Sequence, residues 1–204
     1  MTLKKKIIVF LILLLVIGVG VYIYFSFFST KSTINVKQID KIEEYGYTLN
    51  DRHPEIYKTY FKELKKELSS ESVDEENYVT LISKLFIIDL YSLDIRIDSN
   101  DVGGVEFVYE PIIDSYKEKV QDTIYLHMES NLYGNRKQTL PIVEDVSIDQ
   151  VKTVSYYYED GKKEDKNTYE VTVSWKYKRD LGYQDSAKLY FVHDGNKLSL
   201  VEIK

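Results

Sequence analysis

Cysteine is absent from this chain of 204 residues, and proline is scarce, with three residues. Without cysteine there are no disulfides, no thiol catalysis and no zinc–thiolate sites. A lipoprotein is excluded too, because lipid attachment needs a cysteine directly after an apolar segment. The length allows one domain, or at most two small ones.

Familiar catalytic motifs are missing as well. The chain contains no G-x-S-x-G, no P-loop, no G-x-G-x-x-G and no H-x-x-x-H or H-x-x-E-H spacing. We therefore predict no cofactor, no metal site and no catalytic residue, and we expect a protein that is not an enzyme. A hydrolase or isomerase is the less favoured alternative.

Basic charge is in short supply outside the N-terminus. Of the 27 basic side chains, three (Lys4, Lys5 and Lys6) lie in the first 30 residues, which contain no acidic one. The remaining 24 stand against 33 acidic side chains, which gives that part of the chain a net charge of −9. Such a domain repels nucleic acid, so we exclude DNA or RNA as a main partner.

One long apolar run is present, from Ile7 to Phe28, and it contains no charged residue. At ~1.5 Å per residue it is long enough for a hydrocarbon core of ~30 Å, so we predict a transmembrane helix over residues 7–28. Its aromatic end suits the membrane interface. The alternative is a cleaved signal peptide, whose apolar core is shorter and ends in small residues.

The lysine cluster sets the expected orientation of this helix. Lys4, Lys5 and Lys6 make residues 1–6 a cytoplasmic stub by the positive-inside rule. Residues 29–50 then form a tether, and residues 51–204 form an extracytoplasmic domain. Within the tether, Ile39, Ile42 and Tyr45 have weak helical spacing, so we expect a short helix there that ends at Gly46. The predicted location is the cell membrane, with a single pass.

Periodic apolar residues predict helices in the first half of the domain. Pro54 opens a helix over residues 54–68, and Asp74 caps a second one over residues 75–93. The second helix has a broad apolar face that should be buried on more than one side. A third helix follows Pro111, with its apolar stripe at Ile113, Tyr116, Val120, Ile124 and His127.

Beyond residue 140 the apolar period changes from 3.6 to 2. Apolar and polar residues alternate over residues 168–177, and Gly161 and Gly195 mark two hairpin turns. The order of elements predicts an α+β fold, in which about three helices pack on a curved antiparallel sheet of about four strands.

Few side chains stand out as candidates for chemistry. Asp89 interrupts the apolar run FIIDLY, so we expect it to be partly buried, with an N–H or hydroxyl partner. His127 lies on the apolar stripe of the third helix and, with Asp89, is a possible pocket residue. His53 is expected to be exposed at a helix start, and His193 to lie at a strand end.

The segment DSNDVGG, residues 98–104, partly matches a calcium loop. Asp98, Asn100 and Gly103 fit the pattern, but Val102 stands where an oxygen ligand is needed. Because the twelfth position is Tyr109, which is not acidic, we favour an ordinary turn between helices.

Tyrosine is abundant, with 19 residues. Tyr156, Tyr157 and Tyr158 are consecutive in a predicted strand, so at least one must point outward. They are either an ordinary strand surface or a possible protein interface, since tyrosine is enriched at interface cores.

The order of three helices and then a curved meander resembles the nuclear-transport-factor-like cone fold. With its short stub and single anchor, the chain is similar to assembly-platform subunits of conjugation and type IV secretion machines and to ring-forming membrane proteins of spore formation. Stretches such as YFKELKKEL, LISKLFIIDLYSLD, NDVGG, YGNRKQ and DLGYQ resemble uncharacterised single-pass proteins of low-GC Gram-positive bacteria.

These resemblances imply an interaction or scaffold domain of the cell envelope, in a secretion, conjugation or sporulation assembly. Its expected partners are the membrane and either an envelope protein or a second copy of the chain. The alternative is a module that binds a small ligand or a peptide in the cone interior. The resemblance transfers no catalytic residue.

Overall fold

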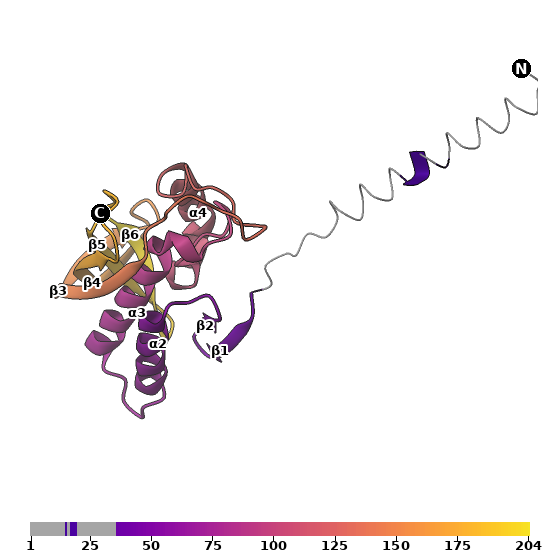
Figure 1. Cartoon of the computed structure of the whole chain (residues 1–204). Helices are drawn as coiled ribbons and strands as arrows, with labels where there is room; N and C mark the ends of the chain where they lie inside the picture. The colour runs from indigo at the N-terminus through magenta and orange to yellow at the C-terminus, as the bar shows by residue number, and fades with distance from the viewer. Residues whose placement is uncertain (1–14, 16, 20–35) are drawn as a thin grey trace, which may run out of the picture. The chain divides into compact units, whose positions relative to one another are not determined.

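The computed structural model describes Leu15, residues 17–19 and residues 36–204 (Figure 1). Among these residues, no helix combines the length and apolar character needed to cross a membrane. The predicted stub, with Lys4, Lys5 and Lys6, and nearly all of the predicted transmembrane helix lie outside the described residues. The larger compact unit of the chain comprises residues 35–204.

This unit has an α+β fold with two antiparallel sheets. The chain order is β1 (Gln38–Ile42), β2 (Tyr47–Asn50), α2 (Glu55–Leu68), α3 (Glu75–Tyr91), α4 (Ile113–Asp122), β3 (Val143–Tyr158), β4 (Lys163–Tyr177), β5 (Ser186–Asp194) and β6 (Lys197–Ile203). Three short 3-10 helices precede α4: η1 (Leu93–Ile95), η2 (Val105–Phe107) and η3 (Glu110–Ile112). The α+β class and the four-stranded sheet were predicted correctly.

The main sheet is a meander in the order β3-β4-β5-β6. Glu159, Asp160 and Gly161 have positive φ in the turn between β3 and β4, as a tight hairpin requires. The register between these strands shifts at three places, and such bulges bend a strand and increase its twist.

Helix α3 is the centre of the core. It packs on β3 and β4 and, on another side, on α2, as Figure 1 shows. Its residues from Leu85 to Tyr91 are all buried, which confirms the prediction of a helix covered on more than one side. Asp74 caps it, accepting hydrogen bonds from the main-chain N–H groups of Glu76 and Asn77.

The predicted helix in the tether is wrong. Residues 38–50 form the β1–β2 hairpin, with Gly46 at a φ of +73° as the last residue of its turn. Tyr47 and Leu49 are buried in the main hydrophobic core, and the ring of Tyr47 stacks on that of Phe107 at 5.0 Å. The hairpin therefore belongs to the folded unit and forms one wall of the cleft described below.

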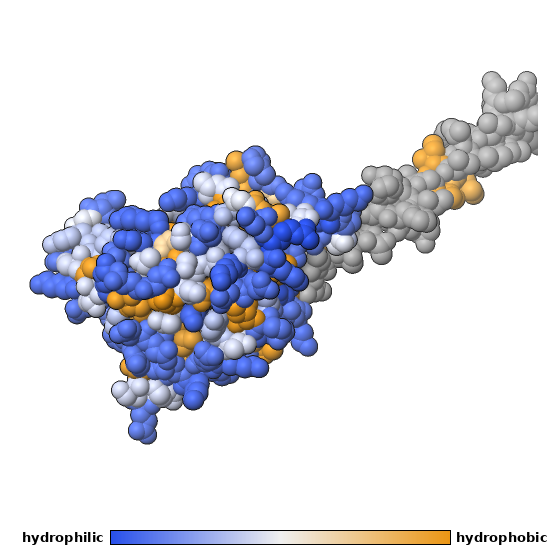
Figure 2. All heavy atoms as spheres, turned by 60° about the vertical axis from the view of Figure 1, so that its left-hand side comes forward, coloured by the Kyte–Doolittle hydropathy of each residue, from blue (hydrophilic) through white to orange (hydrophobic). Residues whose placement is uncertain are grey.

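Helix α4 is shorter than predicted, because it ends at Asp122. Tyr116 and Val120 are buried as expected, but His127 lies beyond the helix and is exposed, so its predicted place on the helical stripe is wrong. It lines a depression of about 440 Å³ beside Ile124, and this depression does not include Asp89. On the face shown in Figure 2, most of the surface is hydrophilic, and apolar residues gather in patches between polar ones.

Candidate functional site

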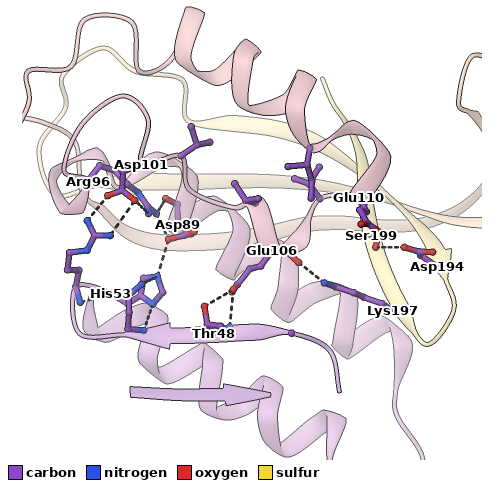
Figure 3. Close-up of a pocket in the computed structure, with 17 residues that line it drawn as sticks. Thr48, His53, Asp89, Arg96, Asp101, Glu106, Glu110, Asp194, Lys197 and Ser199 are labelled. Atoms are coloured by element: carbon purple, nitrogen blue, oxygen red, sulfur yellow. Dashed lines mark hydrogen bonds and ion pairs between the residues drawn. The ribbon is translucent and has the colours of Figure 1, made fainter. Parts of the chain in front are cut away.

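A polar cleft of about 520 Å³ lies between three parts of the chain (Figure 3). One wall is β2 and the turn after it, the second is the segment from Arg96 to Ile113, and the third is the β5–β6 hairpin. Asp89 of α3 also lines it, and ten of its lining side chains are labelled in Figure 3.

Asp89 anchors the inner end of this cleft and is 7% exposed. Its carboxylate forms an ion pair with the guanidinium of Arg96 and accepts a hydrogen bond of 2.6 Å from the main-chain N–H of Gly104. Burial by itself would raise the pKa of Asp89, but the charge of Arg96 and the hydrogen bonds from His53 and Gly104 outweigh it and hold this pKa far below its usual range. The predicted burial is confirmed, and the partners are a guanidinium, an imidazole and a main-chain N–H.

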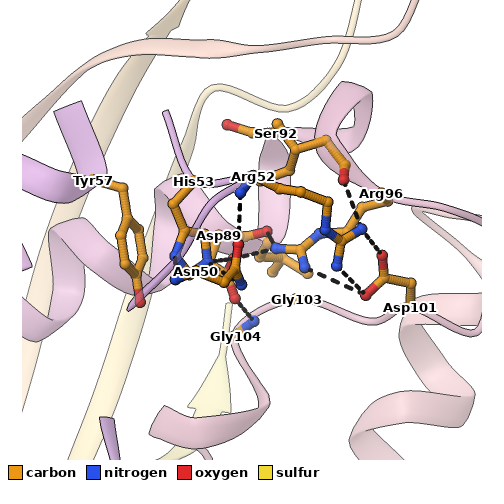
Figure 4. Close-up of polar contacts among 12 residues, drawn as sticks. Asn50, Arg52, His53, Tyr57, Asp89, Ser92, Arg96, Asp101, Gly103 and Gly104 are labelled. Atoms are coloured by element: carbon orange, nitrogen blue, oxygen red, sulfur yellow. Dashed lines mark hydrogen bonds and ion pairs between the residues drawn. The ribbon is translucent and has the colours of Figure 1, made fainter. Parts of the chain in front are cut away.

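His53 is buried against Asp89, which corrects the prediction that it is exposed (Figure 4). Its Nε2 lies 3.1 Å from a carboxylate oxygen of Asp89, and its Nδ1 accepts a hydrogen bond of 3.2 Å from the main-chain N–H of Asn50. The ring stacks on Tyr57 at 3.8 Å. Since both ring nitrogens have partners, His53 holds the β2–α2 connection to α3 and is a poor general base.

A second ion pair closes this end of the cleft. Arg52 donates to Asp101 at 2.5 Å and to the main-chain oxygen of Ile95 at 2.9 Å. Asp101 also accepts from the main-chain N–H of Ile97. Burial would raise the pKa of Asp101, but its bonds to Arg52 and Ile97 lower it. The predicted turn at residues 98–104 is thus a structural element that carries a counter-ion for the two arginines.

Two glycines allow this turn to approach α3. The main chain of Gly103 lies so close to α3 that a Cβ would be 2.1 Å from the main-chain oxygen of Asp89. Gly104 has a φ of +75°, and its Cβ would meet the ring of Phe86 at 2.6 Å. The NDVGG stretch is therefore needed for packing on Asp89.

Glu106 in η2 is the most unusual group of the cleft. One carboxylate oxygen accepts from the main-chain N–H and the hydroxyl of Thr48, at 2.9 and 2.8 Å, and the other accepts from the Tyr57 hydroxyl at 3.0 Å. Burial and the nearby charge of Asp89 outweigh these bonds and raise the pKa of Glu106 to about 7. Among the described residues, no lysine or arginine lies within ion-pair distance of this carboxylate.

Lys197 closes the outer end of the cleft. Its ammonium donates to the main-chain oxygen of Glu106 at 2.7 Å and lies 4.6 Å from the centre of the Tyr47 ring. Burial lowers the pKa of Lys197. Asp194 and Glu110 also line the cleft and are exposed.

The charges of the cleft do not balance. At the inner end, Asp89 and Asp101 neutralise Arg96 and Arg52. Toward the mouth, the three carboxyl groups of Glu106, Glu110 and Asp194 face the single ammonium of Lys197. When Glu106 is ionised, this outer part has a net charge of −2, and a site of that sign attracts cations.

The tyrosine triplet lies at the far end of β3. Tyr157 is 61% exposed, which confirms that at least one of the three points outward. Tyr156 donates to Glu202 and stacks on Tyr190, and Tyr158 packs edge-on against Tyr109. Tyr157 has a partner within the domain as well, since its hydroxyl hydrogen-bonds to Glu164, but it is the one member of the triplet with an exposed side chain. An interface at the triplet stays a prediction.

Sequence reasoning found Asp89 but missed the groups around it. His53 and Gly104 are 36 and 15 positions away from Asp89 in the chain. The adjacent glycines Gly103 and Gly104 were a usable signal that the main chain approaches another element closely. No sequence signal identified Glu106, because its burial arises only when η2 packs on β2. Comparison with protein-family models, curated proteins and solved structures finds no match for this chain.

Proposed function

We propose that this protein is a membrane-anchored binding module of the bacterial cell envelope, whose extracytoplasmic domain holds a ligand with a positively charged amine in the acidic cleft. The observation that supports this best is Glu106, a partly buried carboxyl that faces the cleft without a cationic partner among the described residues.

The electrostatics of Glu106 favour an amine over an anion. Its pKa of about 7 means that ionisation is disfavoured, first by burial and then by the charge of Asp89. A bound ammonium supplies the missing counter-charge and a charged hydrogen-bond donor, and it lowers this pKa. Glu110 and Asp194 extend the negative field to the cleft mouth, where it steers cations inward.

The same geometry favours binding over catalysis. A general base needs an accessible lone pair, yet both nitrogens of His53 are engaged and Asp89 is held as an ionised acceptor by Arg96. Glu106 has the pKa of a proton carrier, and its oxygens keep acceptor positions beside the bonds from Thr48 and Tyr57; we propose that an ammonium uses these positions. We therefore propose that the protein is not an enzyme.

The proposed membrane location and orientation are supported by the sequence. The Lys4–Lys6 cluster and the apolar run after it favour a cytoplasmic N-terminus and an acidic domain outside. We further propose that the main sheet curves into a cone, as in nuclear-transport-factor-like domains, and the three bulges between β3 and β4 support that curvature. Exposed Tyr157 is a second contact point for an envelope partner or another copy in a secretion, conjugation or sporulation assembly.

Two amine probes test the cleft: cadaverine, a free diamine, and an end-blocked Ala-Lys-Ala tripeptide, which presents the amine as a protein side chain does. Full-length protein in detergent micelles is titrated with each, and binding is followed by NMR at Glu106 and Thr48. We expect at least one probe to bind, more tightly at pH 8 than at pH 6, and Glu106→Gln to weaken it roughly tenfold.

The matched control is Glu118→Gln, which removes an exposed carboxyl from α4 outside the cleft. It should leave the affinity unchanged. The end-blocked norleucine counterpart, Ala-Nle-Ala, has a similar chain without charge and should not bind. Equal binding of the charged and uncharged tripeptides, or an affinity that Glu106→Gln does not alter, would contradict the proposal.

A further inference from the structure

A second depression lies between α4 and β6 and is mainly apolar. Its volume is about 500 Å³, and its apolar lining comes from Ile112, Tyr116 and Val120 on one side and from Leu200 and Ile203 on the other. Lys119, Glu202 and Lys204 lie at its polar margin. This groove shares only Val108 with the lining of the acidic cleft, so it is a separate site.

The groove runs along an edge strand. β6 pairs with β5 on one side, at the end of the order β3-β4-β5-β6. On its other side, Val108 forms a parallel bridge with Leu200, and the main-chain N–H of Tyr109 donates to the oxygen of Leu200 at 2.9 Å. Among the described residues, the main-chain pairing of this outer edge stops at Leu200, although β6 continues to Ile203.

The pairing pattern shows which main-chain groups face the groove. Lys204 and Lys188 exchange both of their main-chain hydrogen bonds, at 2.8 and 2.9 Å. In an antiparallel ladder the adjacent pair, here Ile203 and Leu189, does not exchange them. The N–H and C=O of Ile203 therefore point away from β5, toward the open edge, where an added strand can use them.

The charges of the margin indicate what kind of strand fits. Glu202 is already engaged, because it accepts from the Tyr156 hydroxyl and pairs with Lys204 at 2.9 Å. Lys119 is exposed on α4 and adds a positive charge to the margin of a domain whose overall charge is negative. A second copy of this acidic domain is disfavoured by charge repulsion. A peptide that alternates acidic and apolar residues fits better, because its acidic residue can pair with Lys119 and its apolar residues can pack on the apolar lining of the groove.

We infer that the α4–β6 groove binds an extended segment of a partner protein, which adds to β6 as a strand beyond Leu200, places apolar side chains in the groove and sets an acidic residue near Lys119. This interaction goes beyond amine binding in the cleft. The ladder bonds at Ile203 supply affinity, and the alternation of apolar and acidic residues supplies specificity.

The probe is a fluorescent, end-blocked octapeptide, Asp-Val-Thr-Ile-Glu-Val-Thr-Ile, titrated against full-length protein in detergent micelles by anisotropy. One comparison peptide has the same composition without alternation, and another carries lysine in place of both acids. We expect both to bind at least roughly tenfold more weakly than the probe. In the complex, hydrogen exchange of the Ile203 amide should slow.

Three variants locate the bound peptide. Ile203→Pro removes the outward N–H and leaves the Lys188–Lys204 pair in place, and proline is tolerated at such edge positions. Lys119→Glu reverses the margin charge. Both should weaken the probe roughly tenfold. Lys117→Glu makes the same change on α4 outside the groove lining and should not. The fluorescence of Trp175, the single tryptophan, verifies that each variant is folded.

Four results would overturn the inference: no binding at millimolar peptide, equal binding of the comparison peptides, an unaltered Ile203 amide in the saturated complex, or full affinity in folded Ile203→Pro. A dimer of the full-length protein that Ile203→Pro converts to a monomer would assign the groove to a second copy and would also overturn it. Glu106→Gln should leave binding of the peptide probe unchanged. A negative result for peptide binding to the groove therefore leaves the proposal of amine binding in the cleft intact, and the reverse holds too.

Discussion

Gly103 and Asp89 lie in direct main-chain contact: a Cβ on the glycine would be 2.1 Å from the carbonyl oxygen of Asp89 and 2.5 Å from the guanidinium of Arg96. The contact joins the turn at residues 98–104 to helix α3 and fixes the position of η2, which carries Glu106. The cleft therefore depends on a glycine that carries no chemistry of its own.

Gly103→Ala should destabilise the protein strongly. The added methyl group meets main-chain atoms, which cannot rotate away, so we expect the free energy of unfolding to fall by about 3 kcal/mol. Urea unfolding of the full-length protein in detergent, followed by Trp175 fluorescence, measures this. Gly134→Ala is the control: it has open space but a φ of +67°, so it should lose only about 1 kcal/mol. Similar losses for the two variants would show that the close approach is not tight.

Asp89→Asn tests the buried ion pair. Loss of the carboxylate leaves Arg96, which is 5% exposed, without its main counter-charge, and breaking such a pair costs roughly 3 to 5 kcal/mol. Because the folded-state pKa of Asp89 is lowered, its contribution is fully present above the unfolded value of about 4 and is lost as the pH falls toward the folded value.

The difference in stability between wild type and Asp89→Asn should therefore be large at pH 7 and shrink at pH 3. Asp98→Asn serves as the surface control, since its side chain still accepts from the N–H of Asn100, and it should change stability by less than about 0.5 kcal/mol. A pH-independent difference would mean that Asp89 acts only by packing.

The sequence predicted what depends on local periodicity. Alternation over residues 168–177 predicted β4, the turn glycines predicted two hairpins, and the periodic apolar residues after Pro54 predicted α2. It failed at residues 38–50, because Ile39, Ile42 and Tyr45 have helical spacing. The pairing of this segment as a hairpin depends on burial of Tyr47 and Leu49 against Phe107 and α2, which are distant in sequence.

In the candidate site, too, the sequence predicted the local feature and missed the groups that come from distant parts of the chain. Asp89 could be found because a carboxylate in an apolar run needs a partner, but nothing local identifies His53, Arg96 and Gly104 as that set. Glu106 could not be found at all. Its pKa is a product of tertiary burial and of the charge of Asp89, and in the sequence it is one of many exposed-looking acids.

Glu106 should make the stability of the protein fall as the pH rises. A carboxyl whose pKa is raised from 4.5 to about 7 is protonated more readily in the folded state, so the unfolding free energy decreases between pH 4.5 and pH 7. At ~1.4 kcal/mol for each pKa unit between 4.5 and about 7, the loss is at most roughly 3.5 kcal/mol. Glu106→Gln removes this pH dependence, so the free energy of unfolding of the variant should rise relative to that of wild type as the pH increases.

Thermal melts of the full-length protein at pH 5 and pH 8, with Glu118→Gln as a control, measure the effect. The control should keep the pH dependence of wild type, because its carboxyl is exposed on α4. If the melting temperatures of Glu106→Gln and the control change equally with pH, the carboxyl of Glu106 is not held in a low-dielectric environment. The electrostatic argument for amine binding would then be contradicted.

The orientation of the chain is tested by a phosphatase reporter fused after residue 204, which is active only outside the cytoplasm. We expect an active fusion that stays in the membrane fraction after alkaline carbonate washing, because the apolar run of residues 7–28 is predicted to be an uncleaved anchor. Replacing Lys4, Lys5 and Lys6 with glutamate should lower the activity at equal expression. An inactive fusion paired with an active cytoplasmic reporter would contradict the orientation. Release of a shortened, active fusion by the wash would show that residues 7–28 belong to a cleaved signal peptide and not to an anchor.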